Sequence, residues 1–234
     1  MKEMKTTAQV LVDCLEAEGV DVMFGIPGEE TLDLMFAIRD SKIRFIPVRH
    51  EQGAAFMADV YGRLTGRAGV CLSTLGPGAT NLVTGVADAY LDGAPLVAIT
   101  GQVGTDRMQL TSHQYLDLTA MFEPITKRSK QIIRPDTVGE IVRLAFKHAE
   151  KGKPGATIST CPRILQKCPP TPCRSSASRC MRSMPTRPTL QRQEKSSVRR
   201  KIRSSLQARV RCAAMPPLLS PSWLTACTSR WSTL

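Results

Sequence analysis

Short runs of mostly apolar residues alternate with helix-like segments along the first 157 residues of this chain. Each run holds five or six residues and is rich in Val, Ile, Leu and Phe, as is typical of a strand buried on both faces. Helices that join such strands make them parallel. The pattern therefore predicts an α/β fold, a parallel sheet with helices on both faces. The expected strands cover residues 20–24, 43–48, 69–73 and 96–100, and the expected helices cover residues 29–39, 51–64, 79–90 and 137–150, after a first helix that Thr6 or Thr7 caps and Gly19 ends.

Two strand-to-turn-to-helix units carry the residues best suited to bind a ligand. Glu51 opens a helix of otherwise small and apolar residues, where its carboxylate is partly desolvated and needs a partner. In the second unit, residues 74–89, Gly76, Pro77 and Gly78 let the backbone come close to a flat ligand. Both turns follow parallel strands, so we expect them to open at the same edge of the sheet, where ligands of such folds bind.

Four motifs together closely resemble the thiamine diphosphate enzymes of the acetolactate synthase group. The motifs are FGIPGEE at 24–30, RHEQGAAFMADVYGRLTG at 49–66, TLGPGATNLVTGVADA at 74–89 and SHQYLD at 112–117. The resemblance covers about residues 4–157 and is to the N-terminal, pyrimidine-binding domain of that group. It implies thiamine diphosphate as cofactor, a 2-keto acid such as pyruvate as substrate, a site completed by a homo-oligomer (a dimer or tetramer), and a place in branched-chain amino acid biosynthesis.

The resemblance also implies roles for single residues. Glu51 would be catalytic: the matching glutamate hydrogen-bonds a ring nitrogen of the aminopyrimidine and favours the imino tautomer, which takes the proton from the thiazolium carbon. Seven residues in the surrounding turns would contact the cofactor, namely Pro27, Gly28, Thr74, Gly76, Pro77, Asn81 and Gln114.

Each of these residues also has a purely structural interpretation. A glutamate at the start of a helix commonly serves the helix dipole. The glycines, prolines and Asn81 suit any tight strand-to-helix turn, and Gln114 suits a solvated loop. His50 and His113 flank the candidate site, either as titrating groups or as hydrogen-bonded structural imidazoles.

The full-length family carries a second thiamine domain, whose Gly-Asp-Gly motif and a later Asn hold magnesium and the diphosphate. That motif does not occur in this sequence, so we predict no metal-binding residues here. Magnesium bridges phosphate oxygens and supplies much of the cofactor affinity. Some members also bind FAD. We therefore expect the chain to be inactive alone.

The charge of the chain changes abruptly after residue 157. Residues 1–157 hold 17 Lys and Arg against 19 Asp and Glu, whereas residues 158–234 hold 15 against the single acid Glu194. All 16 glycines precede the change, and six of the eight cysteines follow it. We therefore divide the chain into a thiamine diphosphate enzyme domain, residues 1–165, and a basic tail of low order, residues 166–234.

Two functional interpretations of the tail are weak. A disordered basic arm can bind phosphate backbones, but beyond Trp223 and Trp231 this tail lacks the aromatic residues and any fold signature of a nucleic-acid binder. Its cysteines at 168, 173 and 180 have spacings unlike a zinc knuckle. We do not expect nucleic-acid binding or a metal site there.

A shift of reading frame explains the tail better. Joining the last base of each codon to the first two of the next lets residues 159–167 (STCPRILQK) encode IDLPEDIAK, the way a domain of this family ends. The same shift lets residues 206–216 (LQARVRCAAMP) encode AGAGAVRRNA, a glycine-rich turn. Loss of one C from CAT ATC, natural or from sequencing, would turn His-Ile into the observed Ile158-Ser159. We therefore predict that the tail is out of frame.

Within the family, SHQYLD and residues 121–129 (MFEPITKRS) favour an acetolactate synthase-like carboligase or decarboxylase. The alternatives are another thiamine diphosphate enzyme, such as an acetyltransferase or a 2-keto acid or oxalyl decarboxylase, and a non-catalytic basic protein that binds nucleic acid. No segment is apolar for long enough to cross a membrane. The chain starts with an amphipathic helix rather than a signal peptide, so we expect a cytoplasmic protein.

Overall fold

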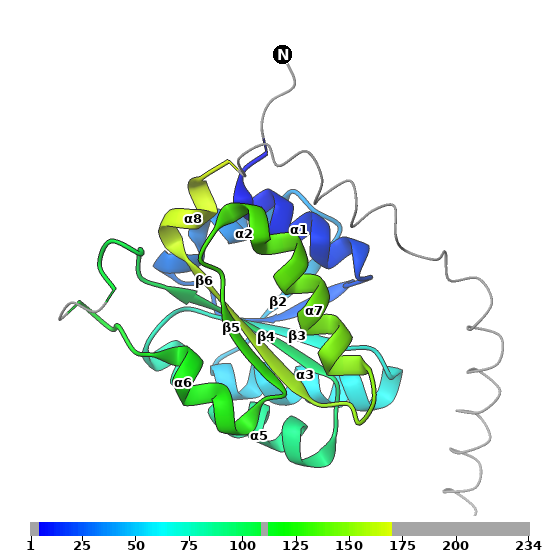
Figure 1. The fold of residues 1–234 in the computed structure, drawn as a ribbon. Helices are drawn as coiled ribbons and strands as arrows, with labels where there is room; N and C mark the ends of the chain where they lie inside the picture. The colour runs from blue at the N-terminus through cyan, green and yellow to red at the C-terminus, as the bar shows by residue number, and fades with distance from the viewer. Residues whose placement is uncertain (1–4, 109–111, 170–234) are drawn as a thin grey trace, which may run out of the picture. The chain divides into compact units, whose positions relative to one another are not determined.

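A six-stranded parallel sheet forms the centre of the fold (Figure 1). The structure is a computed structural model that describes residues 5–108 and 112–169, so the tail prediction beyond residue 169 lies outside the described residues. The strand order is β2-β1-β3-β4-β6-β5, and every neighbouring pair is parallel. The strands are β1 Val22–Gly25, β2 Arg44–Pro47, β3 Gly69–Ser73, β4 Leu96–Gln102, β5 Arg128–Gln131 and β6 Ala156–Pro162.

Helices cover both faces of this sheet (Figure 1). On one face lie α1 Thr7–Ala17, α2 Leu32–Arg39, α7 Val138–Glu150 and α8 Arg163–Lys167. On the other lie α3 Glu51–Thr65, α5 Val83–Asp92 and α6 Leu118–Phe122. The short helix α4 Pro77–Thr80 and three 3-10 turns, η1 Glu29–Thr31, η2 Glu123–Ile125 and η3 Pro135–Thr137, complete the described elements. This confirms the predicted fold class.

The core is split into two layers by the sheet, because successive strand side chains point to opposite faces. In β3, Val70 and Leu72 pack with α1, α2 and α7, whereas Cys71 packs with α3 and α5. In β4, Val97 and Ile99 alternate with Leu96 and Ala98 in the same way. Burial on both faces explains why these strands are continuous apolar runs.

The first helix begins where the sequence predicts. Thr6 is its N-cap: the Thr6 Oγ1 accepts from the Gln9 amide at 3.3 Å, and the Gln9 side chain accepts from the Thr6 amide at 2.8 Å. This capping box satisfies two of the N–H groups that a helix start leaves without partners. The helix ends at Ala17, and Gly19 follows it with φ +83°.

The helix predicted over residues 79–90 is wrong in detail. The structure has two helices there, since α4 begins earlier, at Pro77, and α5 begins at Val83. The Leu82 amide donates to the Ala79 carbonyl, a tight turn of four residues that separates the two helices.

Strands β5 and β6 and helices α6 and α8 were not predicted. The residues of β5, Arg-Ser-Lys-Gln, show no apolar pattern, and β6 contains hydroxyl groups that are satisfied inside the sheet. Thr160 and Thr100 share a 3.1 Å hydrogen bond between β6 and β4. All seven residues of β6 are buried, so the composition change after residue 157 falls inside a core strand.

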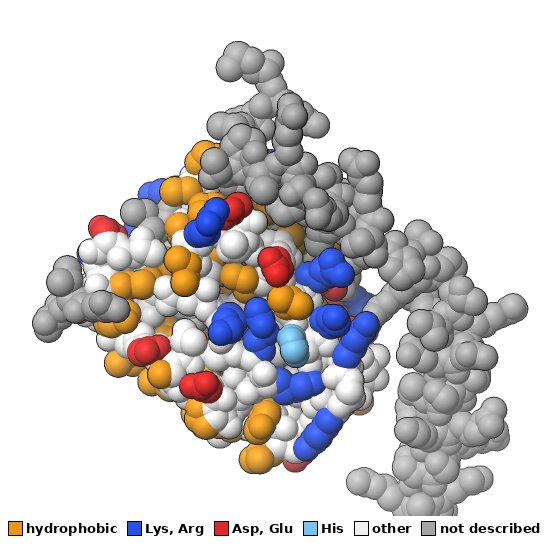
Figure 2. Space-filling view, in the orientation of Figure 1, with side chains coloured by type: hydrophobic (Ala, Val, Ile, Leu, Met, Phe, Trp, Pro, Cys, Tyr) orange, Lys and Arg blue, Asp and Glu red, His pale blue; other side chains and the backbone are white. Residues whose placement is uncertain are grey.

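Lys and Arg side chains gather on the face that α7 covers (Figure 2). The exposed residues Arg143 and Lys147 lie on α7, and the exposed Lys151 and Lys153 follow it. Positive charge at a helix C-terminus is favourable for the helix dipole. Within residues 5–108 and 112–169, no helix is both long and apolar enough to cross a membrane.

Candidate functional site

The turns after the four neighbouring strands β2, β1, β3 and β4 meet at the carboxyl edge of the sheet. The turn after β1 carries Pro27 and Gly28, and the turn after β2 leads into α3 at Glu51. The turn after β3 carries Thr74 and Gly76, and the loop after β4 leads to Gln114. The structure therefore brings these residues to the predicted edge of the sheet.

Glu51 is a buried carboxylate whose two oxygens have different surroundings. The residue is 8 % exposed, and its Oε2 accepts a hydrogen bond from the Asn81 Nδ2 at 3.0 Å. Its Oε1 faces Gly78, where an added Cβ would stand 3.2 Å from that oxygen and 2.8 Å from the Thr74 Cγ2. Among the described residues no side chain or amide donates to Oε1. One oxygen is thus held in place, and the other can accept from a ligand.

His50 caps the helix that Glu51 opens. Its side chain is the N-cap of α3, and its Nδ1 accepts from the Gln52 amide at 3.2 Å. Because an accepting nitrogen carries no proton, this contact fixes the tautomer of a neutral imidazole. Of the two interpretations of His50, the structure favours the structural one.

The turns after β1 and β3 touch through a glycine. A Cβ on Gly28 would stand 2.4 Å from the Thr74 Cβ, so another residue there would push the two turns apart. The Thr31 hydroxyl group holds Gly28 from the other side, at 3.1 Å from its amide nitrogen and 3.0 Å from its carbonyl oxygen. The spacing between these two turns is therefore fixed by side-chain size and by hydrogen bonds.

Gly76 and Gln114 form a second close contact at this edge. A Cβ on Gly76, which has φ +52°, would stand 2.7 Å from the Gln114 carbonyl oxygen and 2.8 Å from its Cβ. Gln114 has φ +59°, the only non-glycine residue with a positive φ among the described residues. Such a backbone costs about 1–3 kcal/mol and persists where the surroundings enforce it, often at functional sites.

The two prolines predicted to contact the cofactor are both exposed. Pro77 is the first residue of α4, and its carbonyl accepts from the Thr80 hydroxyl at 2.9 Å and from the Asn81 amide at 3.0 Å. It thereby sets the turn that presents Asn81 to Glu51. Pro27 directly precedes Gly28.

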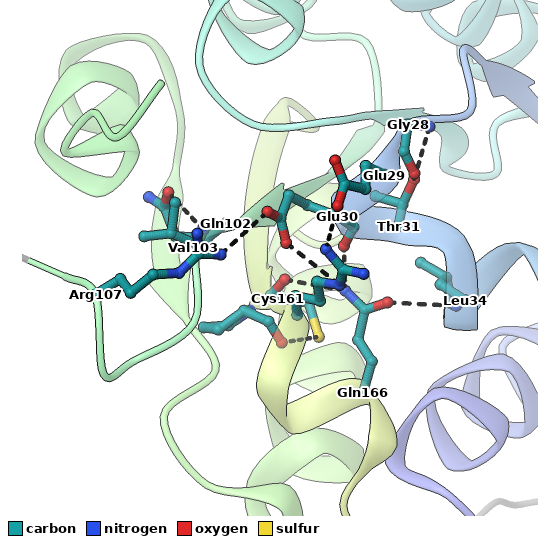
Figure 3. Close-up of polar contacts among 12 residues, drawn as sticks. Gly28, Glu29, Glu30, Thr31, Leu34, Gln102, Val103, Arg107, Cys161 and Gln166 are labelled. Carbon is teal, nitrogen blue, oxygen red and sulfur yellow. Dashed lines mark hydrogen bonds and ion pairs between the residues drawn. The ribbon is translucent and has the colours of Figure 1, made fainter. Parts of the chain in front are cut away.

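A polar network beside the Gly28 turn was missed in the sequence (Figure 3). The buried Glu30 carboxylate lies between two arginines, 3.4 Å from the Arg107 Nη2 through Oε1 and 3.8 Å from the Arg163 Nε through Oε2. Arg163 also donates to Glu29 at 2.7 Å, which lowers the pKa of that exposed carboxyl. In the sequence, Glu29 and Glu30 look like ordinary acids at the start of a helix, which favour the helix dipole. No periodic pattern indicates that the two arginines lie near them.

The donors and acceptors at this edge suit a flat heterocycle with a ring N–H. Glu51 offers a buried acceptor, and glycines let the backbone of the Gly28 and Gly76 turns approach a ring. In the part of the chain that the structure describes, no three His, Cys, Asp or Glu side chains group as metal ligands.

Comparison with known proteins bears on this site. Residues 5–121 match the profile described as "Thiamine pyrophosphate enzyme, N-terminal TPP binding domain"; thiamine pyrophosphate is another name for thiamine diphosphate. The chain is 46 % identical to the probable acetolactate synthase large subunit of Methanocaldococcus jannaschii over 159 residues, 68 % of this chain and 27 % of that protein.

Two further relatives agree. The identity is 44 % to the catabolic acetolactate synthase of Raoultella terrigena, over 74 % of this chain and 31 % of the relative. It is 40 % to the chloroplastic acetolactate synthase 3 of Brassica napus, over 70 % of this chain and 26 % of the relative. The aligned part of this chain thus spans between about a quarter and a third of these relatives' length. The chain belongs to the thiamine pyrophosphate enzyme family and contains its acetolactate synthase-like N-terminal TPP-binding domain.

Proposed function

We propose that this chain is the N-terminal part of an acetolactate synthase-like carboligase or decarboxylase acting on 2-keto acids such as pyruvate. The observation that carries the proposal is the Glu51 carboxylate, buried at the carboxyl edge of the sheet with one oxygen held by Asn81 and the other facing the Gly78 turn. The kinship with acetolactate synthases supports the choice of substrate class.

In this proposal Glu51 accepts a hydrogen bond from a ring nitrogen of the cofactor through Oε1. Bound thiamine diphosphate supplies the carbon nucleophile. The hydrogen bond from Asn81 to Oε2 holds the carboxylate in one orientation, so that Oε1 stays directed toward the cofactor. A buried, charge-assisted hydrogen bond of this kind is stronger than one in water. The Gly28 and Gly76 turns place their backbone against the ring, and Gln114 sits beside Gly76 at the mouth of the site.

Further parts of the proposal concern the intact protein. Magnesium and the diphosphate would be held by a second domain, and FAD is a cofactor of some members. Because the Gly-Asp-Gly motif of that domain does not occur in residues 1–234, we expect these residues alone to bind thiamine diphosphate weakly and not to convert pyruvate. A homo-oligomer, a cytoplasmic location and a role in branched-chain amino acid biosynthesis belong to the same proposal.

The test places residues 1–157 of this chain in the corresponding position of the Methanocaldococcus jannaschii relative. The hybrid should convert pyruvate, and Glu51→Gln should lower its turnover by more than tenfold, about 1.4 kcal/mol of barrier. Glutamine keeps the shape and a hydrogen bond but removes the charge. Glu140→Gln, on the exposed surface of α7, is the matched control and should leave turnover unchanged. A loss below tenfold for Glu51→Gln would exclude Glu51 as the activating acid.

A further inference from the structure

Gln166 is a buried amide whose hydrogen bonds go to the backbone of other elements. The residue lies on α8 and is 1 % exposed. Its Nε2 donates to the Glu30 carbonyl at 2.7 Å and to the Cys161 carbonyl at 3.3 Å, and its Oε1 accepts from the Leu34 amide at 3.3 Å (Figure 3). A polar group this deep is tolerated only when it is satisfied.

Two of these partners belong to the segment that follows the Gly28 turn. The Leu34 amide lies in the first turn of α2, where amides have no partner within the helix. The Glu30 carbonyl belongs to η1, and the next residue, Thr31, holds both backbone groups of Gly28. Gln166 therefore supports the segment that directly follows the Gly28 turn.

The side chains of the same segment are held from α8 as well. Arg163, one turn before Gln166, binds Glu29 at 2.7 Å and lies 3.8 Å from the buried Glu30 Oε2. That oxygen has no hydrogen bond among the described residues, and the nearby cation is Arg163, whereas Arg107 pairs with Oε1. The backbone and the carboxylates of η1 thus both contact α8, a helix about 130 residues later in the chain.

We propose that Gln166 is a positioning residue. It fixes the Gly28 turn against Thr74 and thereby sets the distance between that turn and Glu51. The expected effect on cofactor binding rests on the proposed function. The positioning itself can be measured without cofactor. Gln166 lies beyond the composition change, so the proposal concerns the chain as its sequence stands. In the neighbouring reading frame position 166 would be Ala, and this support of the Gly28 turn would be absent.

The first measurement is amide hydrogen exchange on the full chain. Gln166→Met keeps the length of the side chain but removes all three bonds, and we expect exchange at Gly28 and Thr31 to become at least about tenfold faster. Thr126→Val is the matched control, because Thr126 is also buried and the variant loses a 2.7 Å bond to the Phe122 carbonyl, far along the chain from this turn. It should leave both amides unchanged. Unchanged exchange at Gly28 and Thr31 in Gln166→Met overturns the positioning role.

The second measurement is the affinity for thiamine diphosphate with magnesium, followed by saturation-transfer NMR on the pyrimidine protons. Gln166→Met should weaken binding at least threefold, while Thr126→Val should not. Faster exchange with unchanged affinity would overturn the link between the turn and the cofactor. Faster exchange in a chain whose unmutated form binds no cofactor would reject the proposed function and leave the positioning role standing. If Gln166→Met does not fold, Gln166→Glu, which keeps the size of the side chain but removes the amide donor to the Glu30 and Cys161 carbonyls, should speed the same two amides. Unchanged exchange in that variant overturns the proposal.

Discussion

At the scale of single residues, Arg63 is the partner of Asp59, a deeply buried carboxylate. Its Nε donates to both oxygens of Asp59, at 2.8 and 3.1 Å, and its Nη1 and Nη2 reach Asp92 and Asp88 at 2.7 and 2.8 Å. Asp59 is 2 % exposed. Arg63→Met leaves that carboxylate buried without its partner, so we expect the free energy of unfolding in urea to fall by about 3–5 kcal/mol. Arg39→Met, which breaks an exposed pair with Asp40, should cost less than about 1 kcal/mol.

The pH dependence of this loss follows from the direction of the Asp59 shift. Burial raises the pKa of Asp59 above its ordinary value despite the nearby Arg63. A carboxyl with a raised pKa in the folded state favours folding at low pH and loses that contribution as pH rises through the folded pKa. Removing Arg63 raises the folded pKa further. The Arg63→Met penalty should therefore be smaller at about pH 5 than at about pH 8, and an equal penalty at both would contradict the assignment.

Site residues that are unusual for their neighbours in the sequence could be predicted, and residues whose role depends on tertiary contacts could not. Glu51 stands out as a lone acid on an apolar helix, and the glycines of the Gly76 turn stand out as a backbone signal. The left-handed backbone of Gln114 and the buried amide of Gln166 have no such signal. Both depend on partners from distant parts of the chain, which only the tertiary structure supplies.

At the scale of elements, β6 shows where apolar periodicity fails as a guide. Strands β3 and β4 were predicted because both faces carry aliphatic residues, whereas β6 includes Thr157, Ser159 and Thr160. The Thr157 hydroxyl lies 3.4 Å from the Leu96 carbonyl and 3.3 Å from the Ala145 carbonyl, so the polar atom is satisfied inside the core. Satisfied hydroxyl groups let a polar sequence occupy an interior strand.

Thiol reactivity tests whether β6 forms in solution. Burial raises the pKa of Cys161 in β6 to about 12, and it does the same for Cys71 in β3. The thiolate is the reactive form, so at about pH 8 only on the order of 10⁻⁴ of each thiol is reactive. Iodoacetamide followed by mass spectrometry should leave both cysteines unmodified in the native chain and modify both in urea. Labelling of Cys161 while Cys71 stays protected would show that β6 is not part of the folded sheet.

At the scale of the whole molecule, the chain holds one six-stranded sheet and, in the proposed function, one part of a catalytic site. Four adjacent strand ends supply the proposed pyrimidine site, and the relatives are about three to four times longer than the part that aligns. The composition change falls inside β6, a strand that the fold requires between β4 and β5. A sequence that changes character in the middle of a core strand is not divided at a natural domain boundary.

A small void marks the same place. A cavity of about 10 Å³ lies between α1, α7 and β4, lined by apolar side chains such as Leu11, Val97 and Phe146 and by the polar Ser159. In the proposed neighbouring reading frame this position would be Ile, an apolar residue that suits the apolar lining of the void better than Ser159 does.

Sequencing the gene on both sides of codon 158 is the final test. We expect the neighbouring frame to restore IDLPEDIAK over residues 159–167 and to continue into the Gly-Asp-Gly magnesium motif, because the relatives extend well beyond the aligned part. Ile at position 159 and Leu at position 161 would then extend the apolar packing of β6 on the face shared with α1 and α7. If every shifted frame meets a stop codon soon after codon 158, the frame-shift hypothesis fails. The basic segment would then be a genuine part of this protein, with Gln166 and Arg163 selected for the contacts they make to η1.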